Sequence, residues 1–237
     1  MILIFAATWT QALANEPTLG IAPDAALAAI VAGNKRFVAG TSTHAGASPK
    51  DRAELATGQH PHTMVLACAD SRVAPELIFD QGLGELFVVR TAGNNIDEHG
   101  VASLEYANAH LGSRQLVILG HTSCGAVKAA IQTPWGVSAG SPALDDLVHD
   151  IQLCMGPLSP AQAADPTARE AVWANGLGAR DALLAASPML NDAVKSGHIS
   201  VRVAVYDLES GQVVFEKSKT AAVAPASAPL AAAEHGH

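Results

Sequence analysis

The sequence predicts an α/β protein with a central, mostly parallel β-sheet, helices on both faces and an antiparallel edge strand. Short apolar runs at 64–67, 85–90 and 115–119 alternate with longer segments of helical periodicity, a pattern typical of parallel strands joined by helices. Hydrophobic residues make up 49% of the 237 residues and aromatic residues only 4%. A core of small aliphatic side chains favours helices packed closely on a sheet over an aromatic-rich sandwich.

Helices are predicted where apolar residues recur with helical spacing, in some cases behind an early acidic residue or a proline. The predicted helices cover residues 24–37, 75–80, 101–111, 125–131, 144–153 and 169–186. Two further strands, 199–206 and 212–215, flank a turn at Ser210 and Gly211. They form a predicted hairpin, which supplies the antiparallel strand at the sheet edge.

The ends of the chain differ in composition from the segment between them. Residues 1–14 begin with a short apolar run and end in Ala-Leu-Ala, which resembles the cleavage site of a signal peptide. We interpret them as a signal-peptide remnant and expect a periplasmic or secreted protein, with an N-terminal extension on a cytoplasmic protein as the alternative. Residues 15–219 are predicted to form a single domain, and the Ala/Pro-rich 220–237 a disordered tail. No segment has the length and apolarity of a membrane span.

Charge and cysteine content exclude some classes of function. The formal net charge is −8 and no stretch is rich in Lys or Arg, which argues against nucleic-acid binding. Three cysteines are a poor basis for a disulfide framework. Cys154 follows an amphipathic stretch and is predicted to be a buried packing thiol. Cys68 and Cys124 instead occur beside other residue types that bind metals.

Two motifs follow neighbouring apolar runs at the point where each run ends. Cys68 is followed by Asp70 and Arg72 after the first strand, and His121 is followed by Cys124 after the third. Because parallel strands end at the same edge of a sheet, the two motifs are expected to converge. Two thiolates and one imidazole are ligands that Zn²⁺ prefers. We therefore predict one Zn²⁺ per subunit, held by Cys68, His121 and Cys124.

Asp70 leaves two possibilities for the fourth zinc ligand. If Arg72 holds the Asp70 carboxylate, zinc keeps a water whose pKa falls towards neutrality, and Asp70 accepts the proton of the resulting hydroxide nucleophile. If Asp70 binds zinc, it displaces the water and the site is closed. A closed zinc site that only stabilises the fold is the alternative to a catalytic one.

The segments CADSRVAPELIFDQGLGELFVVRTAGN, LEYA and LVILGHTSCGAV resemble the β-class carbonic anhydrases, and the similarity extends over residues 24–215. The resemblance implies reversible hydration of carbon dioxide to bicarbonate and a proton by zinc-bound hydroxide, with Asp70 and Arg72 controlling the fourth zinc position. It also implies that part of the substrate pocket comes from a neighbouring subunit, and hence a homodimer or a higher homo-oligomer. The substrate-binding residues that it implies are Gln59, Phe87, Ala92, Tyr106 and Gly125.

One subset of this family has a second, non-catalytic bicarbonate site that stabilises the closed form. Its tryptophan is replaced by Val65 in this sequence, although Arg90 matches its arginine. This departure predicts that Asp70 rests on Arg72 and away from the metal. Two alternatives to CO2 hydration are hydrolysis of CS2 or COS at the same zinc, and a non-catalytic zinc protein that senses bicarbonate or serves as a scaffold. The Asp–Arg pair and the pocket residues occur together, which argues against a scaffold, whereas CO2 and CS2 or COS would differ in pocket access, which the sequence does not show.

Overall fold

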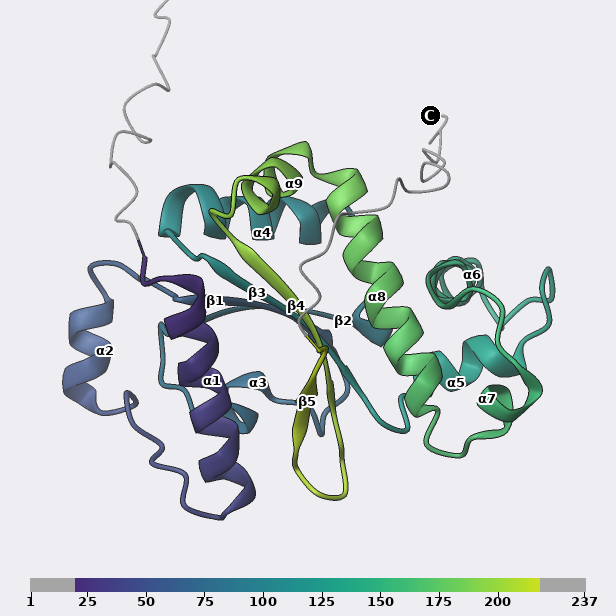
Figure 1. Cartoon of the computed structure of the whole chain (residues 1–237), viewed down its shortest axis with the longest axis horizontal. Helices are drawn as coiled ribbons and strands as arrows, with labels where there is room; N and C mark the ends of the chain where they lie inside the picture. The colour runs from purple at the N-terminus through teal and green to yellow at the C-terminus, as the bar shows by residue number, and fades with distance from the viewer. Residues whose placement is uncertain (1–19, 218–237) are drawn as a thin grey trace, which may run out of the picture.

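The central sheet has five strands in the order β2-β1-β3-β4-β5 in this computed structural model, which describes residues 20–217 (Figure 1). The strands are β1 (Thr63–Cys68), β2 (Leu86–Thr91), β3 (Gln115–His121), β4 (Ser200–Tyr206) and β5 (Val213–Phe215). Strands β2, β1, β3 and β4 are mutually parallel, and β5 pairs antiparallel with β4 at one edge. The predicted parallel sheet with an antiparallel edge strand is therefore confirmed.

Every predicted helix occurs, with ends shifted by a few residues. The helices are α1 (Pro23–Val38), α2 (Pro49–Leu55), α3 (Pro75–Ile78), the 3₁₀ turn η2 (Ala92–Asn94), α4 (Glu98–Leu111), α5 (Gly125–Gln132), α6 (Pro142–Met155), α7 (Pro160–Ala164), α8 (Arg169–Ala186) and α9 (Pro188–Lys195). The sequence interpretation missed α2, α7 and α9, which are short. Each begins with a serine N-cap followed by proline, a helix-start signal that could have revealed them.

Side chains of the central strand β1 alternate between two apolar layers. Met64 and Leu66 belong to a buried cluster with Leu104 of α4 and Leu183 of α8. Val65 and its neighbours on the opposite face pack in a second cluster with α1 and α3. Because adjacent side chains of a strand point to opposite faces, the apolar run fills both layers at once. The prediction of helices on both faces is confirmed, and Figure 1 shows α4 and α1 on either side of the strands.

A third buried cluster lies where α5, α6 and α8 meet near the carboxyl ends of the strands. It includes Cys68, Cys124, Ile151 and Val172. Within this region α8 lies directly against α6, since a Cβ atom on Gly178 would lie 2.2 Å from the carbonyl oxygen of Cys154. Cys154, predicted to be buried, is partly exposed. Desolvation of its thiol raises the pKa of Cys154 to about 11.

Several predictions about the chain ends concern residues that the structure does not describe. The interpretation of 1–14 as a signal peptide and of 220–237 as a tail falls outside residues 20–217, so export stays a prediction. Within the described residues, no helix combines the length and the apolarity needed to cross a bilayer.

Gly178→Ala is expected to destabilise the fold, because the added Cβ would lie 2.2 Å from the Cys154 carbonyl oxygen and push α8 away from α6. Overpacking of this kind costs about 1–3 kcal/mol of unfolding free energy, and more where backbone must move. Urea denaturation measures the loss. Gly58→Ala is the control, since no atom lies within 4 Å of a Cβ added there. Equal denaturation midpoints for Gly178→Ala and wild type would contradict this account of the helix contact.

Candidate metal centre

Cys68, His121 and Cys124 converge at the carboxyl edge of the sheet, and we refer to them as the metal cluster. Their potential ligand atoms all lie within 4.8 Å of one another, and all three residues are buried. Cys68 is the last residue of β1, and His121 is the last residue of the adjacent β3. Cys124 is the N-cap of α5. The structure thus brings together ligands predicted from two separate motifs.

The turn from His121 to Cys124 is fixed by the segments on either side of it. The Thr122 N–H donates to the Tyr206 carbonyl at 2.9 Å, and the Ser123 N–H donates to the Thr167 carbonyl at 2.6 Å. Ser123 adopts a left-handed conformation with φ of 56°, which is strained for a residue other than glycine, asparagine or aspartate. This tight turn directs Cys124 back towards Cys68.

The imidazole of His121 shows that the cluster fits a metal. Its Nδ1 lies 3.0 Å from the Thr122 carbonyl, which can only accept a hydrogen bond, so Nδ1 carries the proton. Nε2 therefore presents a lone pair, and this buried atom has no hydrogen-bond partner in the structure. An unpaired buried polar atom costs about 1–3 kcal/mol. A metal bond would satisfy it, and imidazole with two thiolates is a donor set suited to Zn²⁺.

The two cysteine sulfurs lie 3.9 Å apart and share a hydrogen bond. With Cys124 as the donor, this bond lowers the pKa of Cys68 to about 4 despite the opposing effect of burial, with further help from the backbone at Asp70 and Gly93. The same hydrogen bond, together with desolvation, raises the pKa of Cys124. A metal ligand must be deprotonated, and Cys68 meets this requirement at neutral pH.

Arg72 holds the carboxylate of Asp70 beside the metal cluster. The guanidinium donates from Nε to Oδ1 at 2.9 Å and from Nη2 to Oδ2 at 2.7 Å, and the Arg72 backbone N–H adds a third bond at 2.9 Å. These bonds keep the pKa of Asp70 well below its usual range. Oδ2 lies 3.8 Å from Nε2 of His121. The carboxylate is thus next to the ligands but is held by Arg72.

Arg90 braces the loop that carries both Cys68 and Asp70. Its guanidinium donates to the carbonyl of Cys68 at 3.1 Å and to that of Asp70 at 2.7 Å. Val65, which stands in place of the family's tryptophan and led us to predict that Asp70 rests on Arg72, is fully buried in the layer against α1. In this structure the position of Asp70 therefore follows from direct bonds to Arg72 and from the loop that Arg90 holds.

Two of the predicted substrate-binding residues lie beside the metal cluster. Ala92 opens the turn η2 and precedes Gly93, whose N–H donates to the Cys68 sulfur at 3.3 Å. Gly125 follows Cys124 as the first residue of α5. Both residues are exposed, next to the buried Gly93 and Cys124 respectively.

The other three predicted substrate-binding residues lie away from the metal cluster within one chain. Gln59 is exposed before the start of β1, in a shallow groove beside α2, whereas Cys68 ends that strand. Phe87 is in register with Met64 near the start of the paired strands. Tyr106 is 48% exposed on α4 and contacts the ring of His110. A single chain therefore builds the metal side of the predicted site without these three side chains.

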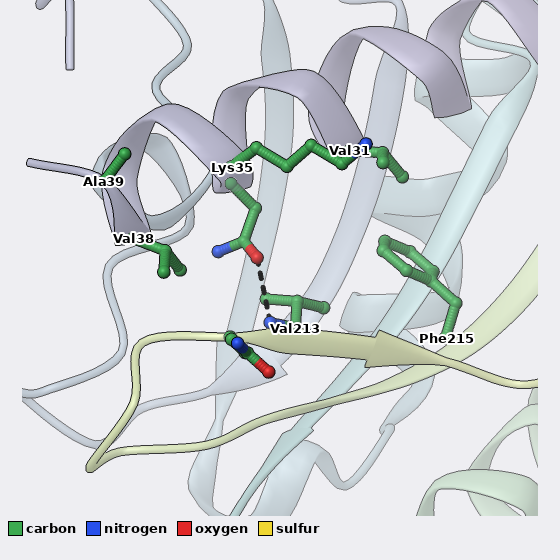
Figure 2. A pocket seen from close by; sticks show the side chains of 8 residues that line it. Val31, Lys35, Val38, Ala39, Val213 and Phe215 are labelled. Carbon is green, nitrogen blue, oxygen red and sulfur yellow. Dashed lines mark hydrogen bonds between the residues drawn. The ribbon is translucent and has the colours of Figure 1, made fainter. Parts of the chain in front are cut away.

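Figure 2 shows a groove between α1 and β5 that contains no member of the metal cluster. Val31, Lys35 and Val38 contribute from α1, and Val213 and Phe215 contribute from β5. The dashed line is the Val213 N–H donating to the side-chain oxygen of Asn34 at 2.9 Å. This bond fastens the edge strand to α1.

Active sites of open parallel sheets lie at the carboxyl ends of their strands, and the metal cluster lies at that edge. Fold and cluster together define an α/β protein with a candidate metal site at this edge of the sheet. A family model described as carbonic anhydrase matches residues 63–213, and solved structures of β-carbonic anhydrases share the fold. The chain belongs to the β-carbonic anhydrase family, as the sequence motifs predicted.

Individual relatives support this assignment. Carbonic anhydrase 2 of Mycobacterium tuberculosis (strain CDC 1551 / Oshkosh) is 55% identical over 109 residues, 46% of this chain and 53% of that protein. The carbonic anhydrase of Pseudomonas aeruginosa is 36% identical over 172 residues, covering 67% of this chain and 74% of that protein. The β-carbonic anhydrase CafA of Aspergillus fumigatus has a TM-score of 0.61 and 29% identity, covering 80% of this chain and 90% of that chain. The chain spans about half the length of the mycobacterial relatives that it matches.

We expect the purified protein to contain one Zn²⁺ per chain, because the lone pair of His121 Nε2 and two adjacent sulfurs are suited to it. Cys124→Ser should reduce the zinc content to near zero, since it removes one of three protein ligands. Cys154→Ser is the matched control, because this cysteine lies outside the metal cluster. Metal analysis by mass spectrometry checks both. Full zinc content in Cys124→Ser would refute this ligand set.

Proposed function

We propose that the protein catalyses the reversible hydration of carbon dioxide to bicarbonate and a proton, with Zn²⁺ held by Cys68, His121 and Cys124. The observation that carries this proposal is the Asp70 carboxylate, which Arg72 holds 3.8 Å from the unpaired Nε2 of His121. A purely structural metal site has no need of a tethered carboxylate at that position. When bound, Zn²⁺ supplies Lewis acidity that makes water a nucleophile near neutral pH.

Asp70 directs the nucleophile in this proposal. Its depressed pKa keeps the carboxylate ionised across the physiological pH range, so its oxygens act only as hydrogen-bond acceptors. Oδ2, the oxygen nearer His121, accepts a hydrogen bond from the attacking O–H group. A lone pair of the attacking oxygen then faces the carbon of CO2. Arg72 has two functions, because it orients the carboxylate and prevents it from occupying the metal.

Gly125 is positioned to bind the bicarbonate product. As the first residue of α5, it has a backbone N–H that no earlier turn of the helix can satisfy. The N-terminus of a helix favours negative charge, and the N–H can donate to a bicarbonate oxygen. Carbon dioxide has no charge and accepts hydrogen bonds weakly, so an apolar wall suits it better than further donors.

We further propose a homodimer in which the partner copy completes that wall. Strand β1 has six residues and spans about 20 Å, which separates Gln59 at its start from Cys68 at its end. Phe87 lies on the edge strand β2, and Tyr106 lies on α4, which contacts β2. If two β2 edges approach antiparallel about a two-fold axis, the start of one strand lies beside the end of the other. The three side chains of one copy then reach the metal cluster of its partner.

Stopped-flow measurement with a pH indicator tests the reaction. The zinc-loaded protein should hydrate CO2 well above the buffer rate, and Asp70→Asn should keep its zinc but lose about 10- to 100-fold in rate, as expected when a group that orients a metal site is removed. Asp192→Asn is the control, since that carboxylate is 77% exposed and pairs with the surface residue Lys195. A zinc-loaded protein no faster than buffer would overturn the proposal. Turnover of CS2 or COS in that protein would favour those substrates instead.

A complementation experiment tests the shared site. Gln59→Ala and Cys124→Ser homodimers should both be inactive, but mixed dimers contain one site with intact metal ligands and an intact Gln59. Random pairing should therefore restore roughly a quarter of the wild-type activity per chain. Asp70→Asn mixed with Cys124→Ser is the control, because both changes affect the metal side and no intact site forms. Absence of recovery in mixed dimers would refute a site completed by Gln59 of the partner copy.

A further inference from the structure

The turn η2 presents a backbone N–H to the metal cluster. The Gly93 N–H donates to the Cys68 sulfur at 3.3 Å, and this contact is buried. Gly93 has a φ of 63°, which strains any other residue, and a Cβ atom there would lie 2.6 Å from the side chain of Ile151. Glycine therefore allows the turn to adopt its shape and to lie against α6.

A buried asparagine on α8 holds the same turn from the opposite direction. Asn175 is 1% exposed, and its side-chain amide donates to the Gly93 carbonyl at 2.8 Å although the two residues are 82 positions apart. An amide in a helix interior costs free energy when it is buried without a partner. Its presence between apolar helices is therefore accounted for by the bond to Gly93.

The two peptide groups that flank Gly93 are each fixed through their oxygen atoms. The Ala92 carbonyl accepts from the Asn95 N–H at 3.3 Å, and the Gly93 carbonyl accepts from Asn175. Because a peptide group is planar, holding its oxygen also sets the direction of its N–H. Together these bonds fix both backbone dihedrals of Gly93. The Ala92 carbonyl bond orients the peptide group that carries the Gly93 N–H. The bond from Asn175 on α8 fixes the next peptide group, and so holds in place the turn from which this N–H faces Cys68.

We propose that Asn175 is a positioning residue for the Cys68 thiolate: it holds η2 so that the Gly93 N–H donates to the sulfur that binds the metal. This inference rests on the proposed function, since it requires a metal at the cluster. A hydrogen bond to a thiolate withdraws electron density from the sulfur. The metal then receives less charge from Cys68 and stays a stronger Lewis acid, as for other groups that orient and tune metal ligands.

The chain contains a matched control for this role. Asn108 is also a buried helical asparagine, and its side-chain amide donates to the Ser113 carbonyl at 3.0 Å. This bond closes the end of α4 and does not involve the metal cluster. A serine at either position removes the bond from the side-chain amide to the backbone carbonyl, while its hydroxyl can bond within its own helix. Asn175→Ser and Asn108→Ser therefore remove the same kind of interaction at different places.

Cobalt-substituted protein gives a readout that a general loss of stability does not move. In Asn175→Ser the sulfur-to-cobalt charge-transfer band should shift to longer wavelength, because the thiolate becomes richer in electrons. Release of the metal to a chelator should be about 10-fold faster or more, because the turn no longer holds Cys68 in the ligand geometry. Asn108→Ser should match the wild-type band and release rate. Thermal unfolding of both variants records their stability.

The outcomes separate this inference from the proposed function. A wild-type protein that takes up no Co²⁺ would overturn both. Uptake by wild type with the same band and release rate in Asn175→Ser would overturn only the role of Asn175. If that variant does not fold, wild-type protein loaded with ¹¹³Cd²⁺ decides by NMR. The Gly93 amide proton should then couple to cadmium through the sulfur, and the Asn175 amide nitrogen to the Gly93 carbonyl carbon. Absence of either coupling would refute the proposal that Asn175 holds the Gly93 N–H against the Cys68 sulfur.

Discussion

Parallel pairing of β1 with β3 is the constraint on which the metal centre depends, because it joins two segments more than fifty residues apart. The register places Ala67 opposite Leu119, so Cys68 and His121 leave the sheet at the same edge. A slip of one residue in β1 would turn Cys68 to the other face of the sheet and exchange the side chains of its two apolar layers. Burial of both layers therefore stabilises the register that brings the ligands together.

The second determinant of the site is the competition between Arg72 and the metal position for the Asp70 carboxylate. Arg72 offers a bidentate, charge-assisted pair, but its side chain is 55% exposed, so solvent screens part of that attraction. Oδ2 lies only 3.8 Å from His121 Nε2, so a rotation of the Asp70 side chain would move the carboxylate from Arg72 to the position where a metal would be held. Arg90 limits this freedom by fixing the backbone of the loop at Cys68 and Asp70. Whether Asp70 stays on Arg72 or moves to the metal position thus depends on the loop as a whole and not on one ion pair.

The sequence allowed the metal side of the site to be predicted because its signals are local. Apolar runs end at Cys68 and close to His121, and strand topology alone makes these ends neighbours. The positions of Asn175 and Arg90 relative to the sulfurs could not be predicted, since each depends on packing between elements distant in sequence. Helix α9 was missed because a proline in the first turn was not interpreted as a start signal after Ser187. The location of Gln59 at the other end of β1 was missed because a resemblance assigns roles to residues without placing them in space.

The division between the two sides of the site has a consequence for assembly. All three metal ligands, the Asp70–Arg72 pair and the Gly93 turn are held by hydrogen bonds within one chain. A folded single chain would therefore carry the whole of the proposed metal site, and metal binding would stabilise it without a partner. Substrate orientation in the proposed dimer instead depends on side chains of β2 and its surroundings, namely Gln59, Phe87 and Tyr106. Dissociation of the dimer should then leave the metal bound but remove the wall that excludes water from CO2. Catalysis should therefore depend on protein concentration, whereas metal affinity should not.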